Sequence, residues 1–156
     1  MKELFCDRIA TAGLIVYFAL AIAWSFIIPL GGGIDEPRHF KYLEIVAEQQ
    51  RLPSAAERAQ AISHHPPLHY TLAAPVHMAT SGLSREAQWH AVRLWNVLLG
   101  GITLVFVFLM LRRLLPNHPR VASFGLIFVG WLPHYLLICA MHSNDITTAL
   151  FATITL

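Results

Sequence analysis

The sequence predicts an all-α protein that crosses a membrane several times. Of its 156 residues, 56% are hydrophobic and only 13% are charged, and the mean hydropathy is +0.54. A soluble domain usually carries about 25% charged residues. The apolar residues also gather in long uncharged runs, which are typical of transmembrane helices rather than of a soluble core. The net charge of only +2 gives no basis for nucleic-acid binding.

Four apolar segments are predicted to be spans, at about 9–30, 92–115, 121–141 and 146–156. At about 1.5 Å per residue the first reaches roughly 33 Å, enough to cross a bilayer core of about 30 Å. A signal peptide is the alternative for this run, because Lys2 and Arg8 precede it, but no small-x-small cleavage site follows. The last segment reaches about halfway across, so we expect it to be an incomplete span and the chain to be truncated there.

The basic residues of the short segments predict the orientation. These residues are Lys2 and Arg8 before the first span, and Arg112, Arg113 and Arg120 between the second and third. Segment 142–145 has neither lysine nor arginine. Because basic loops usually stay in the cytoplasm, we expect the N-terminus there and loop 31–91 outside the cytoplasmic membrane. No separate soluble domain is predicted.

The outer loop 31–91 is expected to contain amphipathic surface helices. In segment 37–50, Phe40, Leu43, Val46 and Ala47 recur at helical spacing, which predicts a helix lying on the membrane. Segment 66–80 is apolar but too short to span, so an interfacial or re-entrant helix is expected. A further helix begins at Ser84 and leads into the second span.

Two adjacent carboxylates, Asp35 and Glu36, follow the first span and begin the first surface helix. An ionised carboxylate in a partly dry site can accept a proton from a substrate hydroxyl. The alternative is that one caps the helix and the other lies in its first turn. Arg38, beside His39, is electrostatically unfavourable so near a helix start, so a bound anion would explain it. Lipid headgroups are the alternative partner for Arg38.

Histidines gather before the second surface helix. The prolines in Ser63-His64-His65-Pro66-Pro67-Leu68-His69-Tyr70 fix an extended backbone, which holds His64 and His65 at one place. The spacing of His65 and His69, and of Glu36 and His39, leaves a divalent metal ion open. No metal ligand is assigned and no cofactor is certain, because such spacings arise by chance and headgroups can also partner histidines.

Polar residues also stand at the ends of the later spans. Asn144 and Asp145 follow the third span, where they suit the start of a helix and can also face an outer site. Arg93 and Asn96 enter the second span together. Polar groups at that depth usually face protein or water rather than lipid.

In this order the motifs resemble the GT-C class of integral-membrane glycosyltransferases, in particular the protein O-mannosyltransferases and aminoarabinose transferases. The resemblance rests on Asp35-Glu36 after the first span, Pro66-Pro67-Leu68-x-Tyr70, Arg93-x-x-Asn96 and the acidic residue after the third span. It covers nearly the whole chain, but only the N-terminal third of such an enzyme.

The resemblance implies an inverting sugar transfer at the outer face. The donor would be a polyprenyl-phosphate sugar and the acceptor a hydroxyl of a lipid, glycan or protein, with Asp35 as base beside Glu36. His65 stands where these enzymes often have lysine, so its part in stabilising phosphate departs from the pattern. The implied substrate-binding residues are Arg38, His39, His64, His65, Tyr70, Arg93, Asn96, Asn144 and Asp145.

Two other functions remain open from the sequence. One is a non-catalytic membrane protein of the same fold that assists envelope polysaccharide assembly. The other is a transporter component, although the charged residues gather at the outer membrane edge and transport sites usually lie near the midplane.

Overall fold

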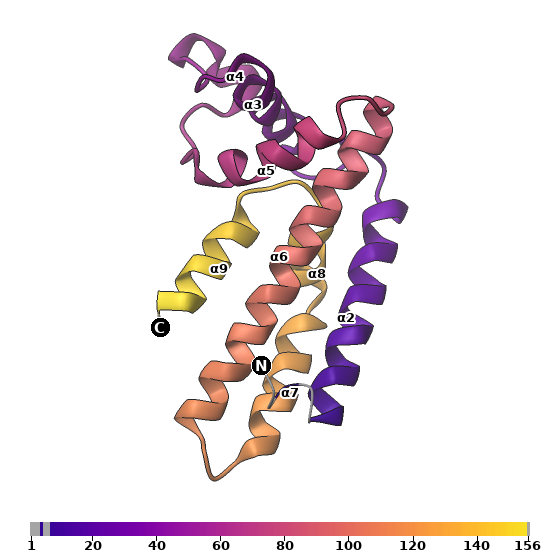
Figure 1. Ribbon diagram of the computed structural model, residues 1–156, viewed down its shortest axis with the longest axis vertical. Helices are drawn as coiled ribbons and strands as arrows, with labels where there is room; N and C mark the ends of the chain where they lie inside the picture. Colours follow the sequence, from indigo (N-terminus) through magenta and orange to yellow (C-terminus); the bar gives the residue numbers. More distant parts are fainter. Residues whose placement is uncertain (1–3, 5–6, 156) are drawn as a thin grey trace.

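The protein is all-helical throughout the part that the structure describes, which confirms the all-α part of the predicted fold class. The computed structural model describes residue 4 and residues 7–155, and no strand occurs among them. Two long helices, α2 (Arg8–Ile27) and α6 (Arg85–Leu114), run side by side with α7 (Pro119–Gly130) and α8 (Pro133–Ala140) (Figure 1). The last helix, α9 (Asp145–Thr155), packs against α6.

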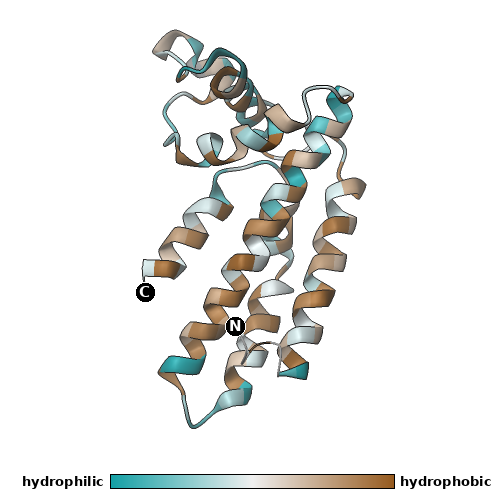
Figure 2. Ribbon diagram, viewed as in Figure 1, coloured by the Kyte–Doolittle hydropathy of each residue, from teal (hydrophilic) through white to brown (hydrophobic). Residues whose placement is uncertain are grey.

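Helices α2 and α6 are each long and apolar enough to cross a membrane. Figure 2 shows apolar residues along the length of these helices, whereas hydrophilic residues concentrate toward the ends of the molecule. Helices α7 and α8 would form a third span if counted together, but they meet at an angle of 62°. The predicted single helix 121–141 is therefore broken. Pro133 explains the break, because a proline disfavours helical backbone at the residue before it, and Leu132 is extended.

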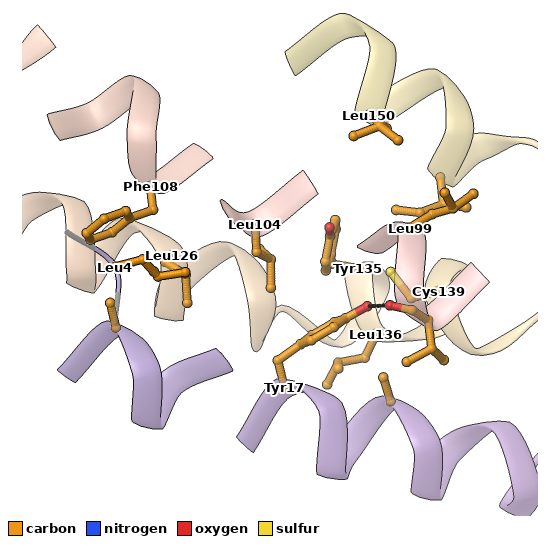
Figure 3. Close-up of a cluster of buried hydrophobic side chains, with 14 of the residues drawn as sticks. Leu4, Tyr17, Leu99, Leu104, Phe108, Leu126, Tyr135, Leu136, Cys139 and Leu150 are labelled. Carbon is orange, nitrogen blue, oxygen red and sulfur yellow. Dashed lines mark hydrogen bonds between the residues drawn. The ribbon is translucent and has the colours of Figure 1, made fainter. Parts of the chain in front are cut away.

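The long helices approach closely at Gly100 of α6. A Cβ atom there would collide with the Tyr17 hydroxyl of α2 and the Cys139 sulfur of α8. Two tyrosine hydroxyls lie buried at this crossing and both find backbone acceptors, as buried polar groups require. Tyr17 Oη donates to Val97 O at 2.9 Å (Figure 3), and Tyr135 Oη donates to Gly100 O at 2.8 Å.

The helices of segment 36–79 form a cap over one end of the bundle, and we call this segment the cap (Figure 1). They are α3 (Glu36–Gln49), η1 (Ala55–Glu57), α4 (Arg58–Ala61) and α5 (Leu68–Ala79). The apolar stripe of α3, predicted to lie on a membrane, is instead buried in the protein. Phe40, Leu43 and Ala47 of this stripe belong to a core cluster shared with α5.

Candidate functional site

The adjacent carboxylates Asp35 and Glu36 lie in opposite environments. Asp35 precedes α3 with a φ of 55°, in the left-handed region, and 49% of its side chain is exposed. Its carboxylate makes no capping hydrogen bond with α3 and instead accepts one from Arg38 Nη1 at 3.0 Å. Arg38 also donates through Nε to Ala59 O, which fixes the pair against the α4 region. Asp35 is therefore an accessible carboxylate on a constrained backbone.

Glu36 is fully buried and ion-paired with Arg93 of α6. Arg93 Nε and Nη2 each lie 2.7 Å from a Glu36 carboxylate oxygen, so the contact is bidentate. The other guanidinium donors bind the carbonyl oxygens at the end of α2, namely those of Ser25, Ile28 and Pro29, at 2.6–2.8 Å. Arg93 thus uses all five of its N–H donors. The pair ties the end of α2 to the start of α3.

Glu36 also gathers three backbone amides. Gly31 N and Gly33 N donate to Oε2 at 3.1 and 3.4 Å, and His142 N donates to Oε1 at 3.0 Å. With the two bonds from Arg93, its carboxylate accepts five hydrogen bonds from the protein. A carboxylate so enclosed acts here as an anchor for the backbone around Asp35. This geometry gives no support to the predicted catalytic role of Glu36.

Asn96 lies three residues after Arg93 on α6 and holds the connection between α8 and α9. Its Nδ2 donates to Met141 O at 2.6 Å and to Ser143 O at 3.1 Å. Asp145 begins α9 directly after this connection, and its carboxylate accepts a hydrogen bond from the Ser143 hydroxyl at 3.0 Å. Arg93 and Asn96, which are both fully buried, therefore position the backbone beneath the two accessible acids.

Four histidines and a tyrosine meet between the cap and α9. We call His39, His65, His69 and His142 the imidazole cluster. His39 Nδ1 shares a hydrogen bond of 2.7 Å with Tyr70 Oη. His69 shares one of 2.7 Å with Thr147 Oγ1 of α9, and its other ring nitrogen lies 3.4 Å from His142 Nδ1. The ring centroids of His39 and His65 are 5.3 Å apart.

Burial keeps three imidazoles of the cluster in the neutral form near pH 7. It lowers the pKa of His39 to about 4 and the pKa of His69 to about 3, with repulsion from neighbouring imidazoles adding to both shifts. The pKa of His142 also lies well below its ordinary value, chiefly because of burial. The charges of Asp145 and Asp35 oppose the shift of His39, so both acids lie close enough to affect its ring.

A groove of about 400 Å³ opens beside the cluster, between the start of α5 and α9. Its polar lining includes His69, Asn144, Thr147 and Thr148, and its apolar lining includes Leu68 and Phe151. Such a groove suits a ligand with a polar head and an apolar body. It contains no charged side chain, so Asp35, Arg38 and Asp145 lie outside its lining.

The structure places the predicted site residues in four kinds of position. Six of them belong to the imidazole cluster or lie around it, namely Asp35, Arg38, His39, His65, Tyr70 and Asp145. Three others, Glu36, Arg93 and Asn96, form the buried support beneath them. Asn144 lines the groove, and His64 is exposed with its ring against that of His65.

The sequence prediction named His69 only for its metal-ligand spacing with His65, and it omitted His142 and Thr147 from the candidate site. Their only signal is position, because His69 lies inside the Pro-Pro-Leu-x-Tyr motif and His142 lies two residues before Asn144. A divalent metal was left open, but no group of three or more His, Cys, Asp or Glu among residues 4 and 7–155 is arranged to hold a metal ion.

Comparisons with known proteins add no assignment to this geometry. No family model, curated protein or solved structure matches the chain.

Proposed function

We propose that the chain carries membrane spans and an outer loop of a membrane glycosyltransferase that uses a polyprenyl-phosphate sugar. The observation that supports it best is the contrast between Asp35 and Glu36. One carboxylate is accessible and the other, with Arg93, holds the backbone next to it. A base needs both access to substrate and a fixed position, and this arrangement supplies the two together.

In the proposed reaction Asp35 accepts the proton of the acceptor hydroxyl. The hydroxyl oxygen forms a bond to the anomeric carbon, and the bond from that carbon to the lipid phosphate oxygen breaks with inversion. The phosphate leaves with the electron pair, and a cation near it would lower the barrier. Arg38 is the cation nearest to Asp35 along α3, at 3.0 Å from its carboxylate. Asp145 supplies a second acid whose charge also acts on His39.

The proposal includes a topology. The N-terminus and the arginine-rich connection after α6 lie in the cytoplasm, and the cap lies outside the cytoplasmic membrane. The acceptor, whether lipid, glycan or protein, then meets the donor at the outer leaflet. The groove lies between the start of α5, which belongs to the cap, and α9.

The test replaces Asp35 by asparagine and measures transfer from radiolabelled polyprenyl-phosphate sugars in membranes that hold the full-length protein. General bases typically contribute about 10²–10⁴-fold in rate, so we expect transfer to fall by at least about 100-fold at unchanged protein level. Glu86→Gln is the matched control, because Glu86 is also an exposed acid in the first turn of a helix. It should keep wild-type transfer.

Two results would count against the proposal. Transfer that survives in Asp35→Asn removes Asp35 as base and moves the assignment to Asp145, tested by Asp145→Asn. A wild-type protein that transfers no sugar from any polyprenyl-phosphate donor favours the non-catalytic member of the same fold.

A further inference from the structure

The imidazole cluster joins parts of the chain that lie far apart in sequence. His39 belongs to α3, His65 and His69 to the start of the α5 region, and His142 to the connection between α8 and α9. The ring centroids of His69 and His142 are 5.0 Å apart, and those of His39 and His142 are 6.2 Å apart. The cluster is therefore a side-chain contact between the cap and the start of α9.

The surroundings of the cluster favour neutral imidazole rings over charged ones. His39, His69 and His142 are each at most 4% exposed, so water reaches them poorly. His142 Nε2 and His65 Nδ1 are buried without a hydrogen-bond partner. A proton added to one of these rings would create a cation beside other imidazoles, and no negatively charged group contacts the ring to offset its charge.

The charged groups around the cluster do not supply that partner. Glu36 contacts the His142 backbone, but Arg93 already neutralises its carboxylate. On α3 and α9, Asp35 and Asp145 favour a charged His39, whereas Arg38 opposes it. On α5, the other histidine that faces His142 is His77, which would repel it if both were charged. Burial lowers the pKa of His39 by more than the charges of the two accessible acids raise it.

We propose that the imidazole cluster is a pH-operated latch, which holds the cap against the start of α9 while its rings are neutral and releases it on acidification. The groove between α5 and α9 is lined by His69 of the latch and by its hydrogen-bond partner Thr147, so release would widen this groove. The latch does not depend on the proposed sugar transfer, and its test uses no enzymatic activity.

The sign of the pH effect follows from the lowered pKa values. The open form binds protons with a pKa near 6.5, whereas the closed form binds them only near pH 4 at His39 and near pH 3 at His69. Stabilisation of the closed form is therefore complete above about pH 6.5 and is lost as the pH falls toward 4. Between pH 7 and pH 5, His39 alone would shift the equilibrium toward the open form by about twentyfold.

Hydrogen–deuterium exchange tests the latch in the full-length chain in lipid nanodiscs. Exchange would be followed from pH 7 to pH 5 and corrected for the intrinsic pH dependence of amide exchange. We expect segments 66–72 and 142–150 to lose protection by at least about tenfold, while segment 97–110 of α6 stays protected.

Two variants identify the titrating groups. His142→Asn removes one imidazole but keeps the backbone N–H that Glu36 accepts, and His69→Asn keeps a side chain able to bind Thr147. Each should reduce the pH response by several fold. His118→Asn is the matched control, because His118 is exposed in the connection between α6 and α7, far from the cluster (Figure 1). It should leave the response unchanged.

Three outcomes would overturn the latch: equal protection at pH 7 and pH 5, a loss of protection that spreads equally through α6, or a full response in both cluster variants. If the variants fail to fold, NMR titration of ¹⁵N-labelled histidine in the wild-type chain decides instead. Several imidazoles should protonate together over the pH range of opening. Independent titration of all histidines near pH 6.5 would contradict the latch.

Discussion

At the scale of single residues, the backbone places the neighbouring acids Asp35 and Glu36 in different environments. Asp35 takes a positive φ in the turn directly before α3. Aspartate tolerates this conformation better than most residues because its short side chain is polar and unbranched at Cβ. The turn leaves Asp35 accessible while Glu36 points to Arg93 in the interior. A two-residue motif therefore combines an accessible carboxylate with a buried one that anchors the backbone beside it.

The buried pair gives the first stability prediction. Arg93→Met would leave the Glu36 carboxylate buried and uncompensated, which typically costs about 3–5 kcal/mol. We expect Glu36→Leu added to Arg93→Met to recover part of this loss, because the double variant no longer buries a lone charge. Denaturant unfolding of the purified protein in detergent, followed by circular dichroism, measures both.

Arg85→Met serves as the control for this prediction. Arg85 pairs with Glu44, but 72% of its side chain is exposed, so its loss should cost no more than about 1 kcal/mol. A double variant of Glu36 and Arg93 that is no more stable than Arg93→Met would show that the carbonyl contacts at the end of α2, rather than the ion pair, dominate.

At the scale of helices, the bundle depends on a close crossing between α2, α6 and α8. Gly100 lies where the three meet, and an added Cβ would collide with Tyr17 and Cys139. Gly100→Ala should therefore destabilise the protein by about 1–3 kcal/mol, the usual cost of overpacking. Gly82→Ala is the matched control, because nothing lies within 4 Å of a Cβ there. Thermal unfolding of the two variants side by side measures the difference, and equal midpoints would contradict the tight crossing.

The helices were largely predictable from the sequence, whereas their partners were not. Apolar runs such as 9–30 predict a helix by their length and composition alone, which are local properties of the sequence. The break before Pro133 carries a local signal that the prediction of one span overlooked. The pairing of Glu36 with Arg93 has no such signal, because 57 positions separate them and the chain offers 9 acidic and 11 basic residues to combine.

The apolar stripe of α3 illustrates the same limit. Periodicity shows that Phe40 and Leu43 share a helix face, but it does not reveal what covers that face. A membrane surface and a second helix both remove apolar side chains from water with similar gain. The stripe packs against α5, whose own sequence was ambiguous because Pro75 interrupts it. The imidazole cluster was missed for this reason, since it exists only where α3, α5 and α9 meet.

At the scale of the whole molecule, a group of arginines lies at the end of the bundle opposite the cap. Arg112, Arg113 and Arg120 surround the connection between α6 and α7, and the cap lies at the other end (Figure 1). A basic connection of this kind resists transfer across a membrane. The proposed topology, with the cap outside and this connection in the cytoplasm, follows from that asymmetry.

Cysteine labelling tests this topology directly. In a chain whose two native cysteines are replaced by alanine, a cysteine would be placed at Gly82, beside the cap, or at Asn117, between α6 and α7. Both positions are exposed, so each should react fully once the membrane is permeabilised. We expect a membrane-impermeant maleimide to label only position 82 in intact spheroplasts. Labelling of position 117 alone would put Asp35 on the cytoplasmic side, where an outer-leaflet sugar donor could not reach it. Labelling of both would mean that α6 does not cross the membrane.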